Sequence, residues 1–240
     1  MGTESTSNIW VYLSASPLLG LTVTMVAYNL TYRVYTHFNA TPLLNPVASA
    51  IVVLILFLYA TGIDYAAYFK GAQFVHFLLG PATVTLAVPL YRQFDRLKQL
   101  WFPILLSIVL GVIVAALCSI GIASTLDASP ETLFSLAPKS ATAPVAMGIS
   151  ERIGGLPSLT AVLVVATGII GAVTGTGLLA LLRIRDDSVK GIAMGLTAHG
   201  IGTARAFQVN NEMGAFSGLA MALSVLTTAL ILPWLVTQIR

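Results

Sequence analysis

Charged residues are scarce in this sequence. Lys, Arg, Asp and Glu make up only 9% of the 240 residues, against roughly a quarter in soluble domains, while hydrophobic residues make up 57%. The few charges cluster between long uncharged runs. These features exclude a soluble globular domain. They predict an all-α, polytopic membrane protein organised as a single transmembrane domain over residues 1–240.

Cysteine and histidine are also rare. The single cysteine, Cys118, cannot form an intramolecular disulfide, and its position inside an apolar run predicts a buried, unreactive thiol. The three histidines are scattered, so no cluster has metal-ligand spacing, and we predict neither a metal site nor a cofactor. No nucleophile has a base at a catalytic spacing. We therefore do not expect an enzyme.

The net charge of +3 could indicate nucleic-acid binding in a soluble protein. Here the basic residues lie in short loops beside apolar runs, where they set the orientation of a membrane protein. The loops at 92–98 and 183–190 are then cytoplasmic, and the acidic loop at 127–131 lies outside. We predict a multi-pass protein of the bacterial cytoplasmic (inner) membrane that has no nucleic-acid partner.

Six uncharged runs approach or exceed the roughly 20 residues that a spanning helix needs. They cover residues 5–32, 34–63, 71–91, 99–126, 153–182 and 213–239. The third run contains two prolines, Pro81 and Pro89, so we expect it to be kinked or broken. Its hydroxyl side chains, Thr83 and Thr85, join the candidate binding groups. The sequence thus predicts about six spanning helices.

A proline-bracketed segment lies in the middle of the chain. Residues 136–147 read LAPKSATAPVAM. Prolines interrupt a helix and leave neighbouring backbone groups unpaired, and in lipid these groups need protein, water or a ligand. Lys139, Ser140 and Thr142 are therefore candidates for binding a small anion. The alternative is a polar loop between helices, with Lys139 snorkelling to the surface.

A second polar segment, at 198–205, reads AHGIGTAR. Its candidate binding groups are an imidazole, two glycines, a hydroxyl and a guanidinium: His199, Gly200, Gly202, Thr203 and Arg205. Glycines let backbone amides approach an anion, and His199 could carry a coupling proton. The alternatives are close helix packing for the glycines and a neutral histidine that is hydrogen-bonded inside the bundle. Arg205 could clamp a carboxylate or pair with Glu212.

The charge pattern constrains how these two segments meet the membrane. If the loop at 183–190 is cytoplasmic, residues 131–157 must start and end outside, and residues 191–211 must start and end in the cytoplasm. Two discontinuous or re-entrant polar segments would then dip in from opposite faces, where they must be buried in protein or line a cavity. In the competing arrangement both segments cross fully, and the loop at 183–190 lies outside.

Internal repetition points the same way. Residues 79–89 overlay 136–146 at a spacing of 57, and residues 137–151 overlay 198–212 at a spacing of 61. The predicted repeat units are 71–125, 130–182 and 189–238. The last two would be inverted copies related across the membrane plane, which is how many secondary transporters build a site near the midplane.

These segments together resemble the LrgB/CidB family of bacterial membrane proteins. The resemblance covers roughly residues 45–233 and rests on LAPKSATAPVAM, on GGLPSLT at 154–160, on TG at 167–168 and on AHGIGTA at 198–204, with LLGPA at 78–82 and AVPLY at 87–91. It implies holin/antiholin-like control of murein hydrolases and autolysis, or transport: plastid relatives exchange glycolate and glycerate, and bacterial members are linked to pyruvate and related monocarboxylates. It also implies a small, separate LrgA/CidA-like membrane partner.

Two classes of function follow. A carrier needs a selective polar site at the midplane, whereas a holin-like regulator needs oligomerisation surfaces and no such site. The two broken polar segments favour a secondary transporter of small monocarboxylates, of the glycolate, glycerate, pyruvate or lactate class. We expect a small anionic substrate, a proton or another cation as the coupling ion, and a homo-oligomer in the lipid bilayer.

Overall fold

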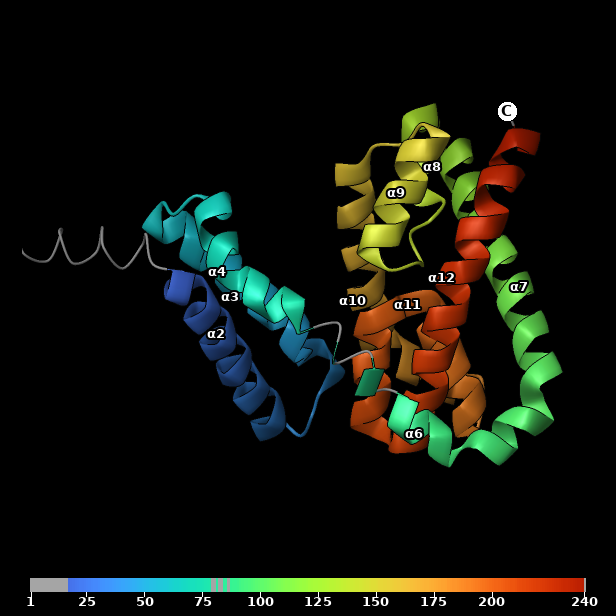
Figure 1. The fold of residues 1–240 in the computed structure, drawn as a ribbon, viewed down its shortest axis with the longest axis horizontal. Coiled ribbons are helices and arrows are strands. Elements are labelled where there is room, and N and C mark those ends of the chain that lie inside the picture. The colour runs from blue at the N-terminus through green and yellow to red at the C-terminus, as the bar shows by residue number, and fades with distance from the viewer. Residues whose placement is uncertain (1–16, 79–80, 82–83, 86, 240) are drawn as a thin grey trace, which may run out of the picture. The chain divides into compact units, whose positions relative to one another are not determined.

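The computed structural model describes residues 17–78, 81, 84–85 and 87–239, and all regular structure within them is helical (Figure 1). The predicted all-α class is therefore confirmed. The chain divides into two compact units, Met1–Thr85 and Leu86–Arg240. Each unit has its own packing and is described by itself.

The first unit contains α2 (Pro17–His37), the 3-10 turn η1 (Pro42–Leu44), α3 (Pro46–Thr61) and α4 (Tyr65–Phe77). The α3 helix begins where the Asn45 side chain accepts hydrogen bonds from the amides two and three residues later. It ends at Gly62, whose φ of 68° is a conformation that glycine adopts readily. The uncharged run at 34–63 is thus divided, because α2 continues to His37 and a new helix starts at Pro46.

The second unit contains seven described helices: α6 (Ala87–Arg92), α7 (Phe94–Thr125), α8 (Pro130–Leu136), α9 (Ala143–Ile153), α10 (Pro157–Leu181), α11 (Asp187–Val209) and α12 (Asn211–Ile239). Among the described helices of the chain, α7, α10 and α12 are long and apolar enough to cross a membrane, while α3 is apolar but has only 16 residues. They account for three of the six predicted spans. The other three stay predictions.

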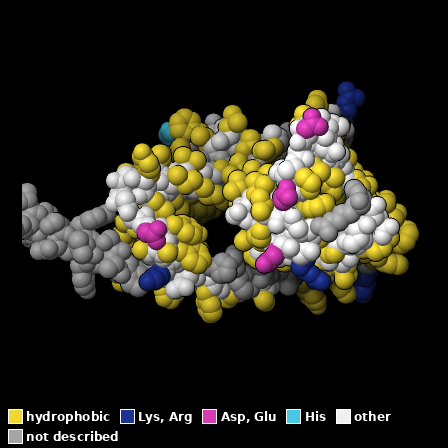
Figure 2. Space-filling view, turned by 90° about the horizontal axis from the view of Figure 1, so that it is seen from above, with side chains coloured by type: hydrophobic (Ala, Val, Ile, Leu, Met, Phe, Trp, Pro, Cys, Tyr) yellow, Lys and Arg dark blue, Asp and Glu magenta, His cyan; other side chains and the backbone are white. Residues whose placement is uncertain are grey.

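The outward surface of these long helices is apolar. Leu110 of α7, Ile170 of α10 and Leu230 of α12 are among their large, exposed hydrophobic side chains. Figure 2 shows many hydrophobic side chains and only a few charged ones on the face seen from above. A water-soluble protein would not expose so much apolar surface. The structure therefore supports a membrane location.

The α7 and α12 helices run side by side in the same direction. Near their starts, Ile108 and Phe216 belong to one hydrophobic cluster. Near their ends, Ile120 and Leu232 belong to another. The α10 helix runs the opposite way, because it begins beside α8, just after the end of α7, and leads back to the start of α11. Three long helices thus frame the unit.

Residues 130–153, here called the first hairpin, join α7 to α10 through α8, a connection at 137–142 and α9. Its two ends lie together, because the Leu156 amide donates to Ser135 Oγ at 2.8 Å and the Thr160 hydroxyl donates to Ser150 Oγ at 2.7 Å. All three hydroxyl side chains are fully buried. Pro138 interrupts the helix, as predicted, and Pro144 occupies the first turn of α9, where its missing donor costs nothing.

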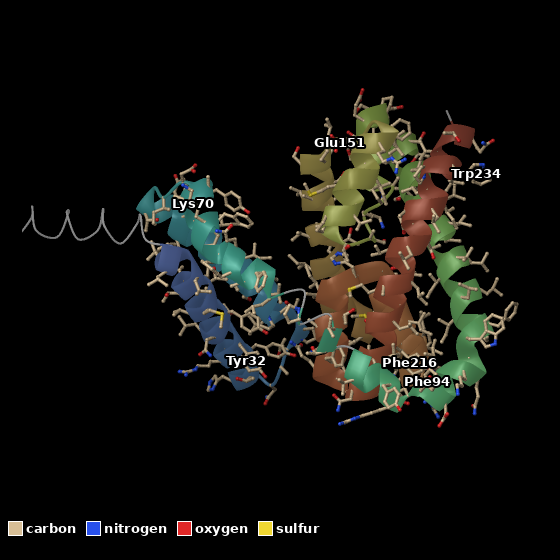
Figure 3. All side chains as sticks on the ribbon, viewed as in Figure 1. Tyr32, Lys70, Phe94, Glu151, Phe216 and Trp234 are labelled. Carbon is tan, nitrogen blue, oxygen red and sulfur yellow. The ribbon has the colours of Figure 1, made fainter. Side chains whose placement is uncertain are left out.

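The α11 helix bends back on itself and is called the second hairpin. At the bend, His199 has a φ of 40° and a ψ of −132°, which are not helical values. The two ends lie together, because Asn210 Nδ2 donates to Asp187 Oδ2 at 2.8 Å. The two hairpins occupy opposite ends of the unit (Figures 1 and 3): Glu151 of α9 lies at one end, and Phe216, which follows the second hairpin, lies toward the other.

Arg96 ties the starts of α7, α11 and α12 together. Its guanidinium donates to Asp186 Oδ2 at 2.7 Å and to Glu212 Oε1. Glu212 therefore pairs with Arg96, not with Arg205 as the sequence allowed, because the fold brings the start of α7 against the start of α12. The same bridge places the loops at 92–98 and 183–190 at one end of the unit, here called the charged end.

Asp186 also caps α11. Its Oδ1 atom accepts hydrogen bonds from the Ser188 hydroxyl and from the amides of Ser188 and Val189. The hydroxyl bond, helped by the neighbouring Arg96, holds the pKa of Asp186 below its ordinary value. Because this pKa is lowered in the folded state, the cap and the ion pair stabilise the fold at neutral pH, and their contribution is lost only as the pH falls through that lowered pKa.

Gly195 is needed for the contact between α11 and α12. A Cβ atom at this position would lie 2.0 Å from the Ser217 carbonyl oxygen, a backbone atom that cannot easily move. We expect Gly195→Ala to destabilise the protein by about 1–3 kcal/mol, which corresponds to roughly 2–4 °C of Tm per kcal/mol in a chain of this size. The measurement is thermal unfolding of the purified protein in detergent.

The control is Gly177→Ala in α10, where an added Cβ meets nothing within 4 Å. This variant should unfold at the wild-type temperature or slightly above it, because alanine favours helix over glycine. Equal Tm values for the two variants would contradict the close contact between α11 and α12.

Candidate functional site

The connection of the first hairpin is a chain of tight turns. The Lys139 amide donates to the Leu136 carbonyl, and the Ala141 amide donates to the Pro138 carbonyl. Thr142 then occupies the cap position of α9, but its side chain makes no capping hydrogen bond. The amides of the first turn of α9 have no partner earlier in that helix. This helix start therefore offers donors and a positive dipole end to an anion.

Three polar side chains surround this helix start. Lys139 is half-buried, and Ser140 and Thr142 are partly exposed. Within the described part of the chain, none of the three side chains takes part in a hydrogen bond or ion pair. Lys139 lies near Cys118 of α7. All three predicted residues of this segment thus lie together, and their donors are free to bind a ligand.

The Cys118 thiol is exposed, so the prediction of a buried thiol was wrong. The buried face of α7 runs through Ile108, Val112, Ala116 and Ile120, and Cys118 lies beside that face. In a helix that is apolar all round, the sequence pattern does not show which face is packed.

A small hollow lies beneath the connection. It is lined by Val112 and Ala115 of α7, by Pro138 and Ser140, and by Thr228 of α12, together with neighbouring alanines. Its volume is about 10 Å³, roughly the space that one water molecule needs. The protein is thus closed around this position, and a carboxylic acid would enter only after a rearrangement.

The break in the second hairpin satisfies its own polar groups. His199 is buried, and its Nε2 atom lies 2.9 Å from the Val164 carbonyl oxygen, which can only accept, so Nε2 carries a proton and donates. Thr203 Oγ1 donates to the His199 carbonyl at 2.8 Å, and Ser217 donates to Thr203 at 3.0 Å. This is the alternative that the sequence offered for His199: a histidine hydrogen-bonded inside the bundle.

The two predicted glycines of this hairpin differ. A Cβ on Gly202 would lie 2.5 Å from Ala198 Cβ and 2.7 Å from the Met194 carbonyl oxygen, so this glycine allows the chain to fold back. Gly200 is exposed, and a Cβ there would meet only Met221 Sδ, at 3.9 Å. Close packing therefore explains Gly202 and does not explain Gly200.

The two breaks share neighbours on α10 and α12. Val164 packs in one cluster with Ala141 of the first hairpin, while its carbonyl accepts from His199 of the second. On α12, Thr203 reaches Met221, and Val225, one helical turn further along, packs against the cluster of Ala141. The structure thus brings both predicted segments to the middle of the unit, here called the mid-unit region.

Three other residues were predicted to contact the substrate: Arg205, Thr85 and Thr83. Arg205 lies six residues beyond His199 and donates from Nη1 to Gln208 at 3.3 Å. Thr85 belongs to the first unit. Thr83 lies outside the described residues. Their proposed contacts with a substrate stay predictions.

A glycine stripe on α10, which was not predicted from the sequence, receives the second hairpin. A Cβ on Gly168 would lie 2.6 Å from His199 Cε1, one on Gly171 would lie 2.5 Å from Ala198 Cβ, and one on Gly175 would lie 2.5 Å from Met194 Sδ. Small residues three and four positions apart are typical of close helix contacts in membranes. This spacing was readable in the sequence.

The mid-unit region suits reversible binding. It offers amide, hydroxyl and ammonium donors for an anion. Among the described residues, no three His, Cys, Asp or Glu side chains gather as metal ligands would. These donors can form hydrogen bonds and an ion pair with a small anion.

Comparison with known proteins gives a consistent picture. The LrgB-like family model matches residues 24–238. The uncharacterized protein YwbG of Bacillus subtilis is 34% identical over 220 residues, which are 92% of this chain and 97% of that protein. The antiholin-like protein LrgB of Bacillus cereus is 30% identical over 218 residues, or 91% and 95% of the two chains, and that of Bacillus anthracis matches equally well. No solved structure matches the chain.

Thr203 should be required for the stability of the bend. In Thr203→Val the His199 carbonyl loses its hydroxyl donor at a buried position, so we expect a loss of about 1–3 kcal/mol in the free energy of unfolding. Thr203→Ser keeps the hydroxyl and should retain most of the stability. Thermal unfolding in detergent measures both variants.

Thr197→Val is the matched control, because Thr197 is an exposed threonine of the same hairpin whose hydroxyl donates within its own helix. It should change Tm little. If Thr197→Val lowers Tm as much as Thr203→Val does, the hydroxyl of Thr203 has no special role at the bend.

Proposed function

Because this chain belongs to the LrgB-like family, we propose that it is a multi-pass protein of the bacterial cytoplasmic membrane that transports small monocarboxylates. The substrate class is that of glycolate, glycerate, pyruvate and lactate. The observation that carries the proposal is the meeting of two broken segments at Val164, with unpaired donors on one of them.

In this proposal α7, α10 and α12 cross the membrane and the two hairpins re-enter from opposite faces. The closed ends of the hairpins support this arrangement: Ser135 bonds to Leu156 in the first, and Asp187 bonds to Asn210 in the second. Each segment then starts and ends on one side. The breaks would lie near mid-membrane, where α7, α10 and α12 shield them from lipid.

The same arrangement supports an inverted repeat. The first hairpin is followed by α10, the second by α12, and α10 and α12 run in opposite directions. At a spacing of 61 residues, Pro138 in the first break corresponds to His199 in the second, and Thr142 corresponds to Thr203. Two such copies related across the membrane plane would bring both breaks to one level.

The substrate carboxylate would bind at the start of α9. The first-turn amides provide donors and the positive end of a helix dipole, Ser140 and Thr142 provide hydroxyls, and Lys139 provides the one charge. A single compact ammonium fits a substrate with one carboxylate and few other atoms. His199 is the candidate for the coupling proton, because an imidazole can change its charge near neutral pH.

A second candidate function is antiholin-like regulation of murein hydrolase export and autolysis. It is favoured by the name of the relatives from Bacillus cereus and Bacillus anthracis, antiholin-like protein LrgB. In this role the chain would act through a homo-oligomer or a small LrgA/CidA-like partner, and would need no selective site. The two candidates differ in whether the purified chain alone moves a substrate.

Uptake into proteoliposomes tests the transport proposal. Radiolabelled glycolate, glycerate, pyruvate and lactate are each offered with and without a proton gradient. We expect Lys139→Ala to reduce uptake of the transported acid by at least about tenfold while the protein stays folded, because an unpaired buried cation contributes nothing to stability. Lys139→Arg should also transport more slowly, because the wide, planar guanidinium of arginine does not replace the compact ammonium of lysine.

Lys98→Ala is the matched control, because Lys98 lies at the charged end, over the Phe94 ring. It should transport like wild type. Wild-type rates in both Lys139 variants would show that Lys139 only reaches the membrane surface. Absence of uptake of all four acids by wild-type protein would overturn the transport proposal and favour the regulatory one.

Cysteine labelling tests the re-entrant arrangement. In a Cys118→Ala background, single cysteines at Lys98 and Arg185 should react with an impermeant reagent from the cytoplasmic side, and a cysteine at Asp127 should react from outside. The reason is that Arg96 and Asp186 bridge the two basic loops. Labelling of Lys98→Cys and Arg185→Cys from opposite faces would mean that the segments cross the membrane.

A further inference from the structure

A groove runs between α7 and α11 at the charged end of the second unit. Its volume is about 290 Å³, and its walls include Leu100, Pro103 and Ser107 of α7 and Ser188, Ile192 and Leu196 of α11. This is room for a small carboxylic acid, which the hollow beneath Ser140 does not have. The groove lies entirely within the second unit.

The mouth of the groove is polar. Arg96 precedes Leu100 by four residues and so lies on the same face of α7. Its side chain is partly exposed and bridges Asp186 and Glu212. Asp186 also accepts from Ser188, which lines the groove. Water therefore reaches this end, and an anion would meet a guanidinium here.

Leu196, which lines the groove, packs against α7 at Gly111. A Cβ atom on Gly111 would lie 2.8 and 2.9 Å from the two Cδ atoms of Leu196, so the leucine side chain sits directly on this glycine. The next residue of α7, Val112, already lines the hollow beneath Ser140, as does Ala115. The groove and the hollow thus lie on either side of the contact between Leu196 and Gly111.

Ser107, Gly111 and Ala115 follow one another at four-residue spacing and form one stripe on α7. The first lines the groove, the second contacts Leu196, and the third lines the hollow. An acid moving along this stripe from the charged end to Ser140 would meet the Leu196 side chain at Gly111.

We propose that Leu196, seated on Gly111, is the gate on the access route from the charged end to the anion site. The proposal rests on the proposed function in taking the hollow beneath Ser140 as that site. His199, with its non-helical backbone, lies three residues after Leu196 and gives the first half of α11 a point at which to pivot. Moving Leu196 off Gly111 joins the groove to the hollow.

Cysteine accessibility tests the route without any substrate. In a Cys118→Ala background, Ser107→Cys on the groove side should react with a small, water-soluble methanethiosulfonate added from the charged end. Ala115→Cys, beyond the gate, should react slowly. Adding Leu196→Ala should raise the labelling rate at Ala115→Cys by about tenfold or more and leave the labelling rate at Ser107→Cys unchanged. The reason is that alanine at position 196 no longer fills the space against Gly111 in the closed state.

The control is Leu110→Ala, which truncates an exposed leucine next to Gly111 on the outer face of α7. It should not change the rate at Ala115→Cys. The proposal is overturned if Ala115→Cys reacts equally fast with leucine and with alanine at position 196.

Transport adds a rescue test. Gly111→Val should reduce uptake about tenfold by wedging the closed gate, and the double variant Gly111→Val/Leu196→Ala should recover it, because the smaller side chain makes room for the larger. Gly121→Val, on the same helix with nothing near an added Cβ, should transport like wild type. No recovery in a folded double variant would count against the gate.

The two proposals fail separately. If wild-type protein moves none of the acids but Leu196→Ala still opens Ala115→Cys to the reagent, the transport proposal fails and the gated route stands. If uptake is observed and the labelling rate does not depend on Leu196, the gate fails and transport stands.

Discussion

Backbone groups that lose their helical partners must find others where water is scarce, and the second unit is arranged around this requirement. In hydrocarbon each unpaired amide or carbonyl costs several kcal/mol. The two breaks are accordingly enclosed by protein: Ala141 is buried against Val164, and His199 is buried against Gly168. The long helices that enclose them keep apolar side chains on their outer faces. The location of the breaks and the apolar exterior thus have one cause.

The two breaks meet this requirement in different ways. In the second hairpin His199 donates to α10, Thr203 donates to the His199 carbonyl and Ser217 donates to Thr203, so the bend is satisfied by protein. In the first hairpin, the side chains of Lys139 and Ser140 have no hydrogen-bond or ion-pair partner in the described part of the chain. Donors that already form hydrogen bonds within the protein gain little free energy by binding an anion, whereas unpaired donors gain much more. This difference supports the proposed binding site in the first hairpin and a structural role for the second.

The sequence predicted features with local causes. Proline and glycine change the backbone only within their own turn of helix, so both broken segments were predicted. Charge clusters between apolar runs marked where the long helices begin and end. It did not predict features that depend on which surfaces meet. Cys118 is exposed because an apolar helix can turn any face to protein or to lipid, and Glu212 pairs with Arg96 because the fold joins two distant helix starts. The order of motifs identified the LrgB-like family, while Val164 and Ser217 could be recognised as neighbours of the bend only from the structure.

The hairpins also differ in how firmly their ends are held. The first is closed by Ser135, Ser150 and Thr160, which are fully buried and neutral, so opening it would leave polar groups unsatisfied inside the protein. The second is closed at the charged end by the hydrogen bond between Asn210 and Asp187, and Arg96 of α7 joins its flanking residues Asp186 and Glu212. The side chains of Arg96, Asp186 and Glu212 are 29–47% exposed, so water can replace these ion pairs at little cost. A carrier needs one element that holds the substrate in place and another that yields to admit it. The free donors lie on the hairpin whose ends are held by buried bonds, and Leu196 lies on the hairpin whose ends are held by exposed ones. This division suits the carrier that we propose.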